Sequence, residues 1–166
     1  PRPLAVFPAG GKFGQVLDVR WLGDPAGERS EKITFPPAPD PTFGLFARDD
    51  RGIAPSGNVV RLVDLDSQLE VEPNATTAEA TAFEAPRLLH GIIAQAGDVD
   101  CFKFAAKKGQ VYDVRVHARA LRSPLDSVLA IRRIGGAGVG SNDDSGTPDS
   151  YLRFRAPEDD EYILSV

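Results

Sequence analysis

The sequence contains a single cysteine and no methionine, and these absences exclude several kinds of site. Because Cys101 is alone, it forms neither an internal disulfide nor a zinc site built on thiolates. Its place between Asp100 and Phe102 in an alternating run indicates a buried strand thiol. No apolar run is long enough to span a bilayer, so we expect no membrane insertion.

Basic and catalytic side chains are also scarce. Nineteen Lys and Arg stand against 24 Asp and Glu, giving a net charge of −5 without any basic run, so we expect no nucleic-acid partner. The two histidines, His90 and His117, stand in no nucleophile or metal-binding motif, and we expect both at the surface. The sequence therefore predicts no catalytic site and no enzyme activity.

What the chain does contain is short alternating runs separated by 16 glycines and 14 prolines, with almost no helical periodicity. This pattern predicts an all-β protein in which only Thr77–Ala82 could supply a helical turn. The predicted strands are residues 4–7, 15–22, 32–35, 42–48, 58–63, 99–105, 110–118, 127–132, 151–156 and 161–166. The proline-rich stretch 36–41 is expected to be an edge or a loop.

Each predicted strand has one apolar face and one polar face, which favours antiparallel sheets packed as a sandwich or jelly roll. Leu17, Val19 and Trp21 share a face in the first half, as do Tyr112, Val114 and Val116 in the second. Residues 67–74 are polar and end in a proline turn, so they indicate a hinge. We therefore expect two β-sandwich domains, residues 1–68 and 69–166, the second truncated at its C-terminal end.

Acidic side chains near the hinge indicate a metal site. Alternation places Glu70, Glu72 and Asn74 on one side of an extended segment, and Asp98 and Asp100 on one side of the next strand. Calcium prefers hard oxygen ligands of this kind. If the two segments adjoin, they supply four carboxylates and one amide oxygen. The alternative is that these are solvated acids at strand ends.

A second acidic grouping is a weaker candidate for a cation site. It consists of Asp126, Asp143, Asp144 and Asp149, and its spacing does not fit an EF-hand loop. The alternative is an Asx-turn loop whose carboxylates accept backbone N–H bonds. The glycine-rich run 135–140 lacks the residues of a phosphate loop and indicates a hairpin turn.

The second half resembles a bacterial pre-peptidase C-terminal (PPC) domain, of a type similar to those in planctomycete proteins. The resemblance covers nearly all of residues 70–166 and is carried by the following segments: Glu70-x-Glu72-Pro73-Asn74, Gly91, Gly97-Asp98-Val99-Asp100-x-Phe102-x-Phe104, Lys108-Gly109-Gln110, Ser123-Pro124-Leu125-Asp126, Asn142-Asp143-Asp144, Asp149-Ser150 and Ala156-Pro157-Glu158-Asp159-x-x-Tyr162. The first half is more weakly similar to immunoglobulin-like IPT/TIG modules, through Pro8-x-Gly10, Gly14 and Gly57-x-x-x-Arg61-Leu62.

This resemblance implies a jelly-roll-like sandwich, appended to a secreted peptidase or surface protein, with calcium at Glu70, Glu72, Asn74, Asp98 and Asp100. We therefore expect a non-catalytic, calcium-stabilised binding or spacer module at an extracellular, cell-surface or periplasmic location. Its expected partners are an extracellular protein or polysaccharide and the neighbouring domains of a longer parent chain. The alternative is a carbohydrate-binding module, for which Trp21 and three tyrosines are a small supply of aromatic platforms.

Overall fold

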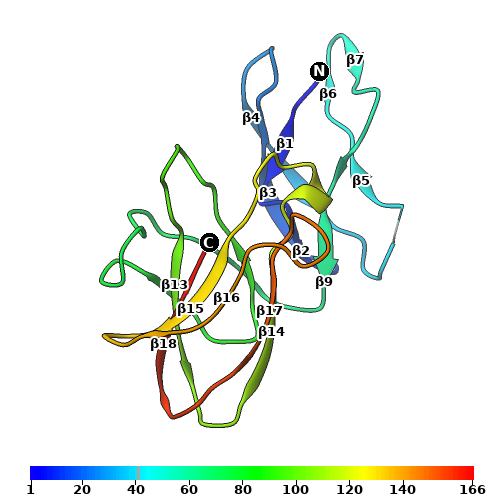
Figure 1. The fold of residues 1–166 in the computed structure, drawn as a ribbon. Helices are drawn as coiled ribbons and strands as arrows, with labels where there is room; N and C mark the ends of the chain where they lie inside the picture. The colour runs from blue at the N-terminus through cyan, green and yellow to red at the C-terminus, as the bar shows by residue number, and fades with distance from the viewer. Residues whose placement is uncertain (41) are drawn as a thin grey trace. The chain divides into compact units, whose positions relative to one another are not determined.

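The computed structural model describes residues 1–40 and 42–166, and Pro41, at the end of the predicted 36–41 linker, lies outside them. The chain is almost entirely β, as predicted (Figure 1). Across the described residues the one helical element is a 3-10 turn, η1 (Arg119–Leu121), and no helix is long and apolar enough to cross a membrane. Two compact units divide the chain: Pro1–Ser67 with Ala120–Ser123, and Gln68–Arg119 with Pro124–Val166.

The first unit is built on a three-stranded antiparallel sheet of order β1-β3-β4. Its strands are β1 (Ala5–Phe7), β3 (Val16–Leu22) and β4 (Arg29–Thr34). The remaining strands pair two by two: β2 (Gly10–Lys12) with β9 (Arg61–Val63), β5 (Gly44–Leu45) with β8 (Asn58–Val59), and β6 (Arg48–Asp49) with β7 (Gly52–Ile53).

Strand β2 lies between the predicted strands 4–7 and 15–22, where the sequence analysis placed no strand. A side chain at Gly10 would place its Cβ 2.0 Å from the carbonyl oxygen of Arg61, so the close parallel pairing with β9 requires glycine there. Gly10 is therefore the residue that lets the two backbones approach.

The core of the first unit follows the predicted alternation. Val19 and Trp21 are buried with Phe35 and Leu45, and Leu17, Ile33 and Phe43 pack against them. Trp21 is 1% exposed and its indole N–H donates to Glu31 Oε2 at 3.0 Å, which satisfies the polar atom of this large side chain. The indole is therefore a core residue and offers no exposed platform for a sugar ring.

The second unit contains a five-stranded sheet of order β11-β13-β18-β15-β16. Its strands are β11 (Thr81–Ala82), β13 (Cys101–Ala106), β18 (Asp160–Ser165), β15 (Leu129–Arg133) and β16 (Gly138–Asn142). Two further pairs are β14 (Val111–Arg115) with β17 (Tyr151–Arg155), and β10 (Ser67–Leu69) with β12 (Leu88–His90).

Side chains from both sheet layers fill the core of the second unit. Phe102, Phe104 and Tyr162 from the large sheet pack with Phe154 of β17, and the ring centroids of Phe154 and Tyr162 are 5.0 Å apart. Tyr112, Val114 and Val116 face this core, which confirms the predicted alternation of that strand. Cys101 is a free, buried thiol, as predicted.

Two local predictions in this unit need different descriptions. Thr77–Ala82 forms no helical turn, because residues 77–79 make a simple turn and Thr81–Ala82 then pairs in parallel with β13. The glycine-rich run 135–140 does turn the β15–β16 hairpin, with Gly135 at a φ of 68°, but its second half continues into β16.

Candidate cation site

Three carboxylates from two distant segments meet at one end of β13. Glu70 and Glu72 follow β10, and Asp100 immediately precedes β13. One carboxylate oxygen from each residue lies within 4.8 Å of the other two. Asp100 is only 3% exposed, so its carboxyl group has left water to join this group. The structure thus brings together three of the four carboxylates predicted for the site.

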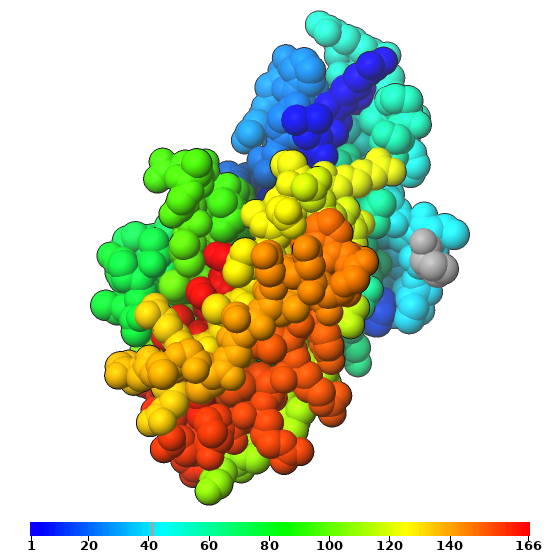
Figure 2. Space-filling model, in the orientation of Figure 1, coloured from blue at the N-terminus to red at the C-terminus, as the bar shows by residue number. Residues whose placement is uncertain are grey.

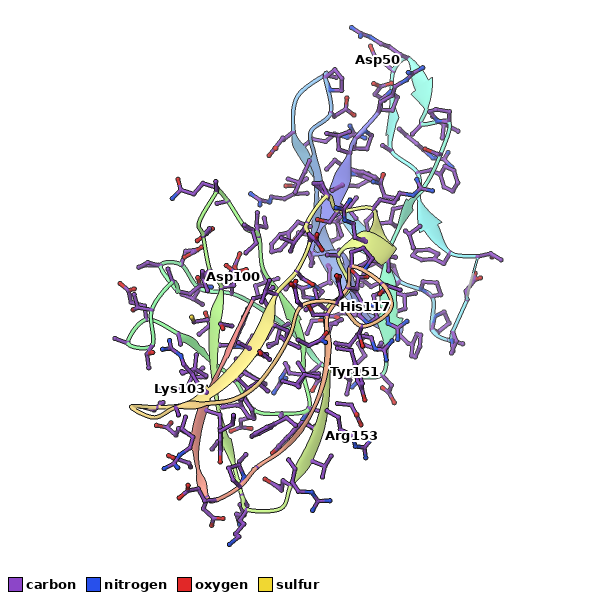
Figure 3. All side chains as sticks on the ribbon, in the orientation of Figure 1. Asp50, Asp100, Lys103, His117, Tyr151 and Arg153 are labelled. Carbon is purple, nitrogen blue, oxygen red and sulfur yellow. The ribbon has the colours of Figure 1, made fainter. Side chains whose placement is uncertain are left out.

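Backbone hydrogen bonds fix both segments in this arrangement. Cys101 N donates to Asn74 O at 3.1 Å, which ties the acidic segment to the start of β13. Asp100 exchanges two 3.1 Å bonds with Val166, and Figure 3 places Asp100 at the start of β13 beside the C-terminal end of the chain. Glu70 N donates to His90 O at 2.8 Å, so residue 70 is anchored to β12.

The carboxylates of the two glutamates are oriented by nearby amides. Glu70 Oε1 accepts a bond from Ile92 N at 2.7 Å, and Glu70 Oε2 accepts one from the Asn74 side-chain amide at 3.3 Å. Glu72 Oε2 accepts a bond from Asn74 N at 2.8 Å. The bond to Glu72 is local, whereas the bonds to Glu70 come from the Asn74 side chain and from the distant amide of Ile92, and together they orient both carboxylates.

Gly91 leaves the space in which the carboxylates meet. A Cβ atom at this position would lie 2.2 Å from Asp100 Oδ2 and 2.6 Å from Glu70 Oε2. Real Cβ atoms do not approach oxygen so closely, so any side chain at residue 91 would displace at least one carboxylate. The sequence shows the glycine, but no local pattern predicts that it lies against both Glu70 and Asp100, because this depends on how distant segments pack.

Two buried oxygen atoms at this site accept no hydrogen bond from any described residue. They are Asn74 Oδ1 and Asp100 Oδ1, and Asn74 is 0% exposed. Burying an acceptor without a partner is costly, and burying a charged one more so. Burial raises the pKa of Asp100 to about 7, and a hydrogen bond with Glu70 and the charges of Glu70, Asp98 and Glu72 add to the rise.

This set of donors fits a hard divalent cation. Calcium is held in proteins by carboxylate and amide carbonyl oxygens in flexible arrangements, and the residues present are Glu70, Glu72, Asp100 and Asn74. A cation there would offset the mutual repulsion of the three carboxylates. It would also give the two unpartnered oxygens something to bind.

Asp98 lies close to this group but is used differently. Its Oδ2 accepts a bond from Ala94 N at 2.8 Å and its Oδ1 one from Val99 N at 3.1 Å, so the carboxylate caps its own loop. Asp98 is not one of the three residues whose oxygens lie within 4.8 Å of each other. It acts on the site by its charge, which contributes to the raised pKa of Asp100.

His90 is buried, and the expectation that it lies at the surface is wrong. It is 8% exposed at the end of β12, and burial lowers its pKa to about 4. The neighbouring Gly91 suggested an exposed turn, whereas the backbone there continues beside Glu70. His117 is half-buried and lies two residues after the end of β14.

The weaker candidate grouping does not converge in the same way. Asp149 Oδ1 accepts bonds from Ala118 N and Arg119 N at 3.0 and 2.7 Å. Asp126, Asp143 and Asp144 are exposed, and the segment that follows β16, orange in Figure 2, forms part of the surface. Among residues 1–40 and 42–166, Glu70, Glu72 and Asp100 are the one group of three acidic, histidine or cysteine side chains close enough to share an ion.

Two comparisons with known proteins bear on this chain. Residues 98–166 match the family described as "Bacterial pre-peptidase C-terminal domain". A 107-residue stretch, 63% of the chain, is 38% identical to a protein of Deinococcus radiodurans described as a "Probable subtilase-type serine protease". The stretch covers 15% of the length of that relative.

Proposed function

We propose that this chain, which carries a bacterial pre-peptidase C-terminal domain at residues 98–166, is a non-catalytic module of a longer exported peptidase. The relative described as a subtilase-type protease supports the association with a peptidase. Because secreted proteases work outside the cytoplasm, the same likeness supports an extracellular, cell-surface or periplasmic location. In this proposal the first unit is an immunoglobulin-like domain that serves as a spacer or binding domain.

Calcium is the proposed ligand of the second unit. The observation that carries this proposal is the pair of buried, unpartnered oxygens, Asn74 Oδ1 and Asp100 Oδ1, beside the carboxylates of Glu70 and Glu72. A solvated acidic patch would leave such atoms in water. Here they are buried, so the folded state carries a cost that an oxygen-binding cation would remove.

The role of the cation is structural. Glu70, Glu72 and Asn74 belong to the segment that enters the second unit, and Asp100 begins a core strand. An ion bound to both fastens the entering segment onto the folded domain. Extracellular modules of modest affinity are saturated by millimolar calcium, and binding then adds stability by mass action.

Isothermal titration calorimetry with calcium chloride tests this proposal. We expect about one ion per chain with a Kd on the order of 0.1–1 mM, the range of extracellular calcium modules. Glu70→Gln should weaken binding at least about tenfold, because it removes a charged ligand. Asp144→Asn, in the exposed loop of the weaker grouping, is the matched control and should bind calcium as the unmodified chain does.

Titrations that show no heat for calcium, or equal weakening by both substitutions, would contradict the assignment. The non-catalytic part of the proposal has its own assay. Incubation of the chain with casein should leave the casein intact, and cleavage by chain purified free of other proteases would show an activity that the proposal denies.

A further inference from the structure

Strand β14 presents an unpaired edge in the second unit. Among the described residues it pairs with β17 alone, from Val111 opposite Arg155 to Arg115 opposite Tyr151 (Figure 1). Val116 N donates to Ser150 O, and Ala156 N donates to Gln110 O. In an antiparallel ladder these bonds recur at every second residue, so Tyr112 and Val114 point their amides and carbonyls toward β17.

The alternate residues of β14 therefore direct their backbone groups away from the sheet. These are Val111, Asp113 and Arg115, and no backbone hydrogen bond between described residues involves them outside the β14–β17 ladder. A row of free N–H and C=O groups on a regular strand is a template for pairing with another strand.

Side chains cover single backbone groups on two other edge strands of this unit, whereas among the described residues none covers an outward-facing backbone group of β14. On β11 the Gln68 side-chain amide donates to Ala82 O at 2.7 Å. Strand β17 is covered at Tyr151 N by Asn142 Oδ1 at 2.9 Å. Strand β14 contains no proline, and its register with β17 is unbroken over five residues, so neither a proline nor a bulge interrupts this edge.

The charged side chains along this edge would complement those of the same edge in a second copy of the chain. Val111, Asp113 and Arg115 share the exposed outer face. If two copies of β14 meet antiparallel about Val114, Asp113 of each copy lies opposite Arg115 of the other. Opposite charges directly across an antiparallel pair are favourable, and a two-fold interface forms every such contact twice.

Contacts already present hold these side chains in place. The Arg115 guanidinium lies 4.7 Å from the centroid of the Tyr151 ring, and Arg153 Nη1 lies 3.3 Å from Asp113 Oδ1. Tyr151 and Arg153 both belong to β17 (Figure 3). The inner face offers Tyr112 and Val114, which are only half-buried, so a second strand would cover more of each.

We propose that the edge of β14 is a self-association surface, at which a second copy of this chain adds its own β14 antiparallel, Asp113 opposite Arg115. The two small sheets then become one four-stranded sheet across the dimer. This inference is independent of the proposed cation, since β14 contributes no residue to the carboxylate group. A short edge buries little area, so the dimer is weak, with a Kd on the order of 0.1–1 mM.

A charge exchange tests the proposal by sedimentation velocity of the whole chain from about 10 µM to 1 mM, the span over which a weak dimer forms. The unmodified chain should change from monomer to dimer with concentration. Asp113→Arg and Arg115→Asp should each abolish dimerisation, because each places like charges opposite one another. The double variant should restore it, which loss of monomer structure alone cannot explain.

Arg155→Asp is the matched control, because Arg155 lies on the same outer face but on β17, away from the edge. It should leave dimerisation unchanged. Amide hydrogen exchange gives a second measurement that needs no variant: the amides of Asp113 and Arg115 should exchange more slowly at high concentration. A chain that stays monomeric at 1 mM, or a dimer indifferent to the charge exchange, would overturn the proposal.

Discussion

The amide of Cys101 donates a 3.1 Å hydrogen bond to the carbonyl of Asn74, across 26 intervening residues. This bond sets the entering segment of the second unit beside the first residue of β13. As a result, Glu70 and Glu72 lie next to Asp100. This contact between a connector and a core strand is therefore one of the backbone bonds that assemble the proposed cation site.

Gly91→Ala should disrupt the site while leaving the fold largely intact. The new Cβ would overlap Asp100 Oδ2 and Glu70 Oε2, so one carboxylate must move. We expect the free energy of unfolding to fall by about 1–3 kcal/mol, the usual cost of overpacking, and calcium stabilisation to disappear. Chemical denaturation with and without calcium measures both effects.

Gly138→Ala is the control for that substitution, since a Cβ there meets nothing within 4 Å. It should leave the calcium response unchanged. If Gly91→Ala kept the full calcium response, the space above Gly91 would not be where the ion binds.

Asp100 should make the calcium-free protein less stable as pH rises. Its folded pKa of about 7 exceeds the ordinary value of 3.8, so the folded state holds an extra proton between these values. The stabilising contribution is complete below about pH 4 and is lost as pH rises through 7. At pH 8 without calcium, the free energy of unfolding of Asp100→Asn should therefore exceed that of the unmodified chain by about 1–3 kcal/mol. Urea denaturation measures this difference.

His90 should act in the opposite direction. Its folded pKa of about 4 lies below the ordinary 6.5, so its contribution is present above pH 6.5 and is lost as pH falls through 4. In the calcium-free wild type the two groups oppose each other between about pH 4 and 6.5. In His90→Gln, where Asp100 still titrates, stability should fall as pH rises. In Asp100→Asn, where His90 still titrates, stability should rise with pH. Parallel profiles for the two variants would contradict this account.

Asp98→Ala should loosen the loop before β13 and leave the first unit folded. It removes acceptors for Ala94 N and Val99 N, and each lost bond costs about 1 kcal/mol. Because Trp21 is the one tryptophan and lies in the core of the first unit, its emission should stay that of a buried indole. Asp98→Asn retains an acceptor and should lose less stability.

The sequence predicted the parts of this molecule that depend on alternation. The buried faces of β3, β14 and β17 follow the period of two, because a strand with one wet face must alternate. Trp21 and Cys101 were likewise placed correctly in cores. These features are local, so a short window of residues determines them.

Features set by distant backbone contacts were less accessible. His90 was predicted at the surface because Gly91 suggests a turn, whereas the carbonyl of His90 accepts a bond from Glu70. Alternation predicts the side chains of Asp98 and Asp100 on the same face of a strand, yet Asp98 caps its own loop and Asp100 faces Glu70. The free edge of β14 is invisible in sequence, because it depends on which strands pair.

Differential scanning calorimetry in 10 mM calcium and in chelator measures whether a calcium ion stabilises the second unit. With a Kd of about 0.1–1 mM, 10 mM calcium adds about 1.4–2.7 kcal/mol to the free energy of unfolding. This increase raises the melting temperature of a unit of this size by about 5 °C or more. The account predicts this rise for the unmodified chain and its absence in Asp100→Asn. An equal melting temperature with calcium and with chelator would contradict it.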